Sequence, residues 1–190
     1  RLFIGQKSKS GRIRVLEDQR ANVRLGKDAF SRGYIRPATQ VELSKALSQF
    51  RRVCDLFKVD GIQAVGTSAL RDSKNGANVV AKIKDQTGIN VQLINGQREA
   101  QLVHKAVCHA VDLSQETALL IDQGGGSLEV VVSRKARLVT KQSLPLGTVR
   151  LIERLNGRAS YEEIANMVRS PLYRLRIELL GRREKPIGLM

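Results

Sequence analysis

Short apolar runs alternate with polar residues near the start of the chain, a pattern typical of half-buried strands. The runs cover residues 2–6, 12–16 and 22–25. Polar segments rich in Ser, Gly, Asp and Gln separate them, as expected for turns. This pattern predicts a three-stranded antiparallel meander.

The spacing of apolar residues then changes to the three- and four-residue steps of a helix. After Pro37, residues 39–42 read Thr-Gln-Val-Glu, the pattern of a capping box. The apolar stripe that follows predicts a helix from there to about Gly61. Further along, the sequence predicts, in turn, a strand, a helix, a strand and a helix, over residues 62–65, 77–84, 91–94 and 97–111. This alternation implies an α/β domain with a largely parallel portion.

The pattern restarts near residue 113, which predicts a second structural unit. Strands are expected over residues 118–121, 128–132 and 138–141, and helical segments over 148–155, 161–168 and 171–180. We therefore predict one domain over residues 1–112 and an incomplete second domain over residues 113–190. Both chain ends read as interrupted strands, including 186–190, so we interpret the sequence as an internal piece of a longer protein.

Composition and net charge indicate a folded protein with a polyanionic partner. The 190 residues are 42% apolar, which supports a buried core, and carry a net charge of +15, which favours a polyanionic partner. The basic surplus lies in residues 1–60 and 134–190, whereas residues 61–133 hold six basic and seven acidic side chains. No apolar run is long enough to span a membrane and no signal peptide opens the chain, so a cytoplasmic location is expected.

Metal and nucleic-acid alternatives receive little support. Two cysteines are too few for a disulfide framework and are expected to be reduced. A zinc site would have to combine Cys54, His104, Cys108 and His109, without any paired C-x-x-C. Nucleic-acid binding is disfavoured because aromatic residues make up 4%, Trp is absent and no recognition motif appears.

The strongest motif is a glycine-rich turn between two predicted strands, residues 121–129. Asp122 precedes Gly124, Gly125, Gly126 and Ser127, and Glu129 follows on the outgoing strand. Backbone N–H groups in such a turn can bind phosphate oxygens. The two carboxylates are suited to Mg²⁺, directly or through water. The alternative is a glycine-rich hairpin with solvated acids, although an ordinary turn does not need three glycines.

Two further strand ends carry polar side chains. Thr67 and Ser68 follow one strand, and Arg71, one helical turn later, is positioned to grip a phosphate. Glu99 lies in the first turn of a helix after another strand, where a carboxylate can orient and deprotonate water. Alone, the first segment is equally consistent with an N-capping hydroxyl followed by a solvated arginine. Alone, the second is better explained as an acid that stabilises the first turn of a helix. Together with the glycine turn they predict a phosphate-transfer site.

These segments, in this order, resemble the exopolyphosphatase / guanosine pentaphosphate phosphatase (Ppx/GppA) family. The similar segments are residues 14–18, 24–26, 67–75, 96–100, 121–129 and 144–151. The resemblance implies a ribonuclease-H-like fold, shared with actin, sugar kinases and heat-shock chaperones, in which two domains close on a phosphate-binding cleft. It also implies Mg²⁺-dependent hydrolysis of the terminal phosphoanhydride of polyphosphate or guanosine pentaphosphate, a role in the stringent response, and a possible homodimer.

By motif position, the resemblance implies that Glu99 is the catalytic base and Arg71 the phosphate-gripping arginine. It further implies that Asp122 and Glu129 are metal-associated, and that residues 124–127 form a phosphate loop. The family's first strand and first phosphate loop are missing from this sequence. Arg98 stands where the family often has an acid, and we expect its charge to lower the pKa of Glu99.

Three other functions compete with this interpretation. One is a non-catalytic polyphosphate- or nucleotide-binding module, which the missing first loop favours. Another is a nucleic-acid binder, suggested by the net charge alone. The third is a sugar or acetate kinase of the same superfold.

Overall fold

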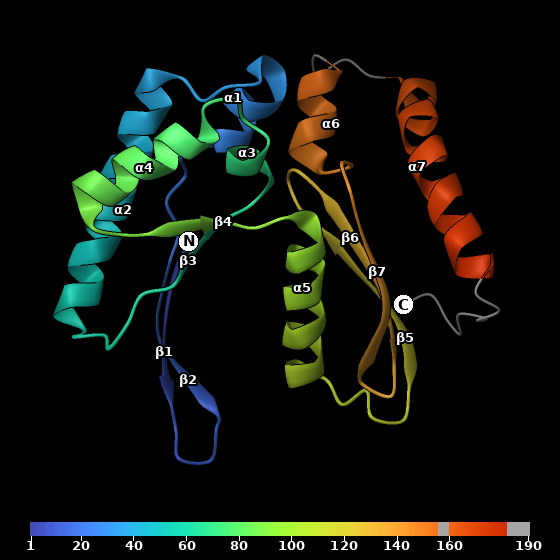
Figure 1. Cartoon of the computed structure of the whole chain (residues 1–190), viewed down its shortest axis with the longest axis horizontal. Helices are drawn as coiled ribbons and strands as arrows, with labels where there is room; N and C mark the ends of the chain where they lie inside the picture. The colour runs from blue at the N-terminus through green and yellow to red at the C-terminus, as the bar shows by residue number, and fades with distance from the viewer. Residues whose placement is uncertain (156–159, 182–190) are drawn as a thin grey trace.

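The computed structural model describes residues 1–155 and 160–181, with side chains described as far as Pro171. Helices and strands alternate along much of the chain (Figure 1). The strands are β1 (Leu2–Lys7), β2 (Ile13–Gln19), β3 (Ala64–Gly66), β4 (Val91–Leu93), β5 (Thr117–Gln123), β6 (Leu128–Arg134) and β7 (Arg137–Leu144). The helices are α1 (Leu25–Arg32), α2 (Pro37–Leu56), α3 (Ser68–Arg71), α4 (Gly76–Thr87), α5 (Gly96–Ala110), α6 (Thr148–Arg154) and α7 (Tyr161–Gly181).

The first half of the chain contains two small sheets and a helical layer. β1 pairs with β2 in antiparallel fashion, and β3 pairs with β4 in parallel. Helices α2 and α4 lie together on one side (Figure 1). Their apolar stripes meet in a core built from Ile35, Leu43, Leu70, Val79, Ile83, Ile89 and Val91. The parallel β3–β4 pair confirms the α/β alternation that the sequence predicts.

The second half is organised around an antiparallel sheet in the order β5-β6-β7. The central strand β6 is its most buried member, with Val130, Val131 and Val132 at most 6% exposed. Helix α5 packs against β6 and β7 (Figure 1). Elements from both sides of residue 112 therefore share one core, and the predicted division between domains at that residue stays a prediction.

The predicted third strand at residues 22–25 is wrong. Residues 21–24 are irregular, and α1 begins at Leu25 after Arg24 adopts a left-handed conformation with φ 53°. Helix α1 packs against α3 and α6. These tertiary contacts override the local alternation of apolar residues, which alone favours a strand.

The predicted capping role of Thr39 is also wrong, because α2 begins two residues earlier at Pro37. Proline suits a first helical position, since its missing N–H is not needed there. Thr39 is buried and its hydroxyl bonds the carboxylate of Asp28, which also accepts from the backbone and side chain of Arg36. Burial alone would raise the pKa of Asp28, but these hydrogen bonds outweigh burial and lower it.

After β7, the described residues lie mostly in the helices α6 and α7. The two predicted segments at 161–168 and 171–180 form the single helix α7, which contains Pro171. The predicted strand at 186–190 lies outside the described residues. Within the described part of the chain, no helix combines the length and apolar character that crossing a bilayer requires.

Candidate active site

A cavity of about 270 Å³ lies where the two halves of the molecule meet. Its walls come from α3, the start of α5, the β5–β6 turn, the end of β7 and α6. The lining residues are Arg71, Asp72, Asn95, Gly96, Gln97, Ser127, Ser143, Leu144, Pro145 and Arg150. Because α3 follows β3 and α5 follows β4, the cavity lies at the carboxyl ends of the parallel strands, the edge where α/β proteins bind ligands.

Arg71 lines this cavity and contacts Glu99, 28 positions away, which is not among the described residues that line it. Arg71 Nη1 donates to Glu99 Oε2 at 3.2 Å and to the carbonyl of Ile94 at 3.0 Å, while its Nε donates to Asp72 at 2.9 Å. Both side chains are about four-fifths buried. Among the described residues, Arg71 Nη2 has no acceptor. The guanidinium is therefore fixed in place and retains a donor for a ligand in the cavity.

The pKa of Glu99 is raised above its ordinary value. Burial is the main cause, and the nearby carboxylate of Glu129 adds to it; hydrogen bonds from Arg71 and Thr67 and the charge of Arg71 offset part of the rise. The expectation that Arg98 lowers this pKa is wrong. Arg98 is exposed and its guanidinium donates to Gln101, one turn along α5. A carboxylate with a raised pKa is suited to accept a proton from water.

Arg150 is a site residue that the motif analysis did not single out. It is 7% exposed, its Nη2 bonds Asp72, and its Nε donates to the carbonyl of Gly126 at 2.6 Å. Its guanidinium also lies over the ring of Phe30, 4.1 Å from the centroid. Asp72 thus bonds Arg71 on one side and Arg150 on the other. The only sequence signal for Arg150 was its place in the similar segment 144–151.

The glycine turn is held by α6. The carbonyls of Gly124 and Gly125 accept from the N–H groups of Thr148 and Arg150, each at 3.0 Å. Gly124 N–H donates to the carbonyl of Ser127, so this amide is not directed toward a ligand. Within the described residues, the amides of Gly125, Gly126 and Ser127 have no acceptor. Of these three residues, only Ser127 is among the described residues that line the cavity.

Gly126 must be glycine because its surroundings are tightly packed. Its backbone conformation does not require glycine, since its φ is not positive. A Cβ there would lie 1.9 Å from Ser68 Oγ and 2.6 Å from a ring carbon of Phe30. The turn therefore rests on α3. Ser68 is buried behind the turn and does not line the cavity, and neither does Thr67, whose hydroxyl bonds Glu99.

A polar row crosses the second sheet beneath the start of α5. Asp122 pairs with Glu129, and Glu129 with Ser143, in register across β5, β6 and β7. Directly opposed residues share one face of a sheet. Ser143 Oγ donates to Glu129 Oε1 at 2.7 Å, and a Cβ on Gly96 would lie 2.4 Å from Ser143. Glu129 therefore lies under the helix end that carries Glu99, whereas Asp122 is exposed at the edge of the row.

The two carboxylates of this polar row, Asp122 and Glu129, suit an open Mg²⁺ site better than a site closed by protein ligands alone. In the described residues, no group of three or more His, Cys, Asp or Glu side chains is arranged to hold a metal. Glu129 is 1% exposed, and its hydrogen-bond donor is a neutral hydroxyl rather than a cation. Mg²⁺ is often held by one or two carboxylates, with water and phosphate oxygens completing its shell. Asp122 and Glu129 fit that requirement.

The four residues considered for zinc do not form one cluster. Cys54 is buried in α2, whereas His104 and Cys108 lie on α5, with Cys108 Sγ 3.4 Å from His104 Nε2. His104 Nε2 also lies 3.0 Å from the hydroxyl of Ser133, a completely buried residue. This is a structural hydrogen-bond cluster between α5 and β6.

Comparison with known proteins identifies the family of this chain. The model of the Ppx/GppA phosphatase family matches residues 4–172. Exopolyphosphatase 1 of Mycobacterium tuberculosis is 29% identical over 150 residues, which are 79% of this chain and 44% of that protein. The chain spans less than half the length of this curated relative.

Solved structures that resemble this chain include members of the same family. An exopolyphosphatase from Cytophaga hutchinsonii superposes with a TM-score of 0.76 at 32% identity, covering 80% of this chain and 48% of that one. The Ppx/GppA family member from Aquifex aeolicus superposes with a TM-score of 0.73 at 25% identity, covering 98% of this chain and 59% of that one. These likenesses confirm the predicted ribonuclease-H-like α/β fold.

The ionic bridge through Asp72 predicts a specific loss of stability. We expect Asp72→Ala to lower the free energy of unfolding by about 1–3 kcal/mol, because it leaves the buried Arg150 guanidinium without its carboxylate. The matched control is Asp55→Ala, which breaks the exposed Arg51–Asp55 pair within α2 and should cost about 0.3–0.5 kcal/mol. Urea denaturation measures both values. Equal losses in the two variants would contradict the role given to Asp72.

The raised pKa of Glu99 predicts a pH-dependent stability. A carboxyl whose pKa is higher in the folded than in the unfolded chain stabilises the fold below its unfolded value of about 4.3, and that contribution is lost as pH rises through the folded value. Glu99→Gln removes the charge at every pH. Its melting temperature should therefore exceed that of the unsubstituted protein at pH 7, and the difference should shrink toward pH 4.

The control for this measurement is Glu116→Gln, which changes an exposed carboxylate. It should show no such pH-dependent gain. A Glu99→Gln variant that is less stable than the unsubstituted protein at pH 7 would mean that the Arg71–Glu99 ion pair outweighs burial.

Proposed function

This chain belongs to the Ppx/GppA phosphatase family, and we propose that it releases the terminal phosphate of inorganic polyphosphate. Water activated by Glu99 is the nucleophile in this hydrolysis. The observation that carries the proposal is the contact between Arg71, a cation that lines the cavity, and Glu99, a carboxylate of raised pKa. The curated relative and the solved structure named exopolyphosphatases support this choice of reaction.

The terminal phosphate would bind between Arg71 and the glycine turn. Arg71 offers its Nη2 donor, and Ser127, which also lines the cavity, offers a backbone amide that has no acceptor within the described residues. The amides of Gly125 and Gly126 lie next to it in the same turn. Arg150, Thr67, Ser68 and Gly124 act as positioning residues. They hold the turn, α3 and Glu99 in place through the contacts described above. This division of roles refines the predicted set of phosphate-binding residues.

Hydrolysis requires one proton transfer and one bond cleavage. The water oxygen attacks the terminal phosphorus in line with the bridging oxygen, Glu99 accepts the water proton, and the bond to the bridging oxygen breaks. The products are orthophosphate and a chain one phosphate shorter. Mg²⁺ bound near Asp122 and Glu129 would neutralise charge on the phosphate oxygens. Most of the rate enhancement comes from positioning and charge stabilisation.

The cavity wall favours polyphosphate over guanosine pentaphosphate. None of the described residues that line the cavity is aromatic, so they offer no ring on which a guanine base could stack. Polyphosphate needs only cations and hydrogen-bond donors. A non-catalytic binding module would have the same cations, but it would have no use for a carboxylate of raised pKa beside them.

Removing the carboxylate of Glu99 should stop turnover while leaving substrate bound. We expect Glu99→Gln to reduce kcat by about 10²–10⁴-fold, the usual contribution of a general base. Its dissociation constant for polyphosphate should stay within a few-fold of the original or fall, because a negative charge beside Arg71 is removed. Orthophosphate release and equilibrium binding measure the two quantities.

The control is again Glu116→Gln, which should retain full activity. Normal phosphate release by Glu99→Gln would contradict the role of Glu99. Binding without hydrolysis by the unsubstituted protein would support the non-catalytic module instead.

The metal requirement yields a separate prediction. Treatment with a chelator should abolish phosphate release, and Mg²⁺ should restore it. Glu129→Gln should raise the Mg²⁺ concentration needed for half-maximal activity by about tenfold or more, because it removes a buried carboxylate from the row. Full activity after complete removal of divalent metal would contradict a metal-assisted reaction.

A further inference from the structure

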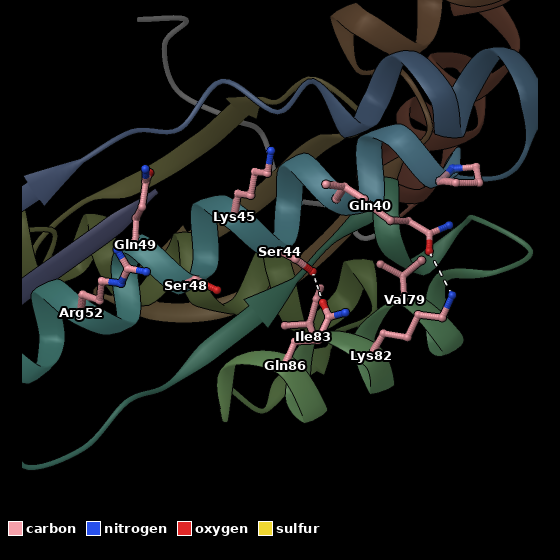
Figure 2. Close-up of a pocket in the computed structure, with 12 residues that line it drawn as sticks. Gln40, Ser44, Lys45, Ser48, Gln49, Arg52, Val79, Lys82, Ile83 and Gln86 are labelled. Atoms are coloured by element: carbon pink, nitrogen blue, oxygen red, sulfur yellow. Dashed lines mark hydrogen bonds between the residues drawn. The ribbon is translucent and has the colours of Figure 1, made fainter.

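A second cavity, of about 590 Å³, lies between α2 and α4 (Figure 2). It shares no lining residue with the cavity that contains Arg71. Figure 1 places α2 and α4 on one side of the molecule, and α5 with the β5–β7 sheet on the other. The groove is therefore a separate surface from the candidate active site.

Among the described residues that line this groove, three are cations and none is acidic. Lys45 and Arg52 come from α2 and Lys82 from α4, and all three are exposed (Figure 2). In the described part of the chain, none of the three pairs with a carboxylate. By contrast, arginines nearby on the same helical layer are neutralised, as in the Arg36–Asp28 and Arg51–Asp55 pairs.

Uncharged polar groups line the rest of the groove. Lys82 Nζ donates to Gln40 Oε1 at 3.5 Å, and Ser44 Oγ donates to Gln86 Oε1, so side-chain bridges cross between the helices (Figure 2). Lys45 and Arg52 are seven residues apart on one face of α2, a separation of about 10 Å along the helix. The cations are thus spread along a groove rather than gathered at one point.

From these observations, we propose that the α2–α4 groove binds an internal stretch of a linear polyphosphate chain. Charges distributed along an elongated groove match a ligand with a negative charge at every repeat, and a single phosphate would engage them only in part. None of the described residues that line the groove is aromatic, so they offer no stacking platform for the bases of single-stranded RNA. The proposal rests on the proposed function, since it adds a second contact for the same substrate.

The test compares two triple variants with equal loss of charge. The first changes Lys45, Arg52 and Lys82 to Gln. The control changes Lys7, Lys9 and Arg12 to Gln, three exposed cations of the β1–β2 hairpin. Equal charge loss in both variants cancels any effect of net charge alone, and all six positions are exposed, so both proteins should fold.

Equilibrium binding is measured with long-chain polyphosphate and with tripolyphosphate over a range of salt concentrations. The groove variant should bind the long chain at least tenfold more weakly, and its salt slope should fall by about 2, in line with three lost ionic contacts. Its affinity for tripolyphosphate should change less than threefold. The hairpin control should leave both affinities within threefold of the original.

Several outcomes would contradict the proposal that the α2–α4 groove binds polyphosphate. One is an equal loss of long-chain affinity in the groove and hairpin variants, which would mean that only net charge matters. Another is unchanged long-chain affinity in the groove variant combined with weaker binding of single-stranded RNA, which would assign the groove to RNA. Because these are binding measurements, they stay informative if no hydrolysis is found, and loss of hydrolysis in Glu99→Gln with intact groove binding would concern the active site alone.

Discussion

The candidate site depends on one carboxylate, Asp72, which bonds two guanidinium groups from distant parts of the chain. Arg71 is its sequence neighbour, whereas Arg150 lies 78 positions away on α6. Arg150 in turn holds the carbonyl of Gly126, so the bridge joins α3 to the glycine turn of the second sheet. This bridge adds a charged link to the packing of α5 on β6 and β7 and of α1 on α6, and it fixes Arg71 relative to the glycine turn.

Buried charges around Arg71, Glu99 and Glu129 are not balanced by the protein, and the proposed ligands carry the opposite charges. Glu99 and Glu129 are both largely buried, and the repulsion between them contributes to the raised pKa of Glu99. Arg71 partly compensates on one side. A phosphate group brings negative charge toward Arg71 and the free amides, and a divalent cation beside Glu129 would balance the remainder. The substrate thus supplies negative charge opposite Arg71, and the metal ion supplies positive charge opposite Glu129.

Local patterns predicted much of this architecture. Hydrophobic periodicity located α4 and α5, and it located β1 and the strands of the second sheet to within a few residues. It failed at residues 22–25 and at Thr39, where contacts with distant elements decide the conformation. In the site, strand-end reasoning placed Arg71 and Glu99 at one edge, and the structure brings them into contact. It missed Arg150, because the interactions that make it important join segments far apart in sequence, and it misjudged Arg98, whose side chain turns toward Gln101.

The account is tested most directly by a crystal structure of the Glu99→Gln protein with tripolyphosphate bound. We expect this structure to show a terminal phosphate in the cavity, within hydrogen-bond distance of Arg71 and of the amides of the glycine turn. A water should lie between that phosphorus and residue 99. A terminal phosphate bound elsewhere, with Arg71 still closed against residue 99 and no anion in the cavity, would contradict it.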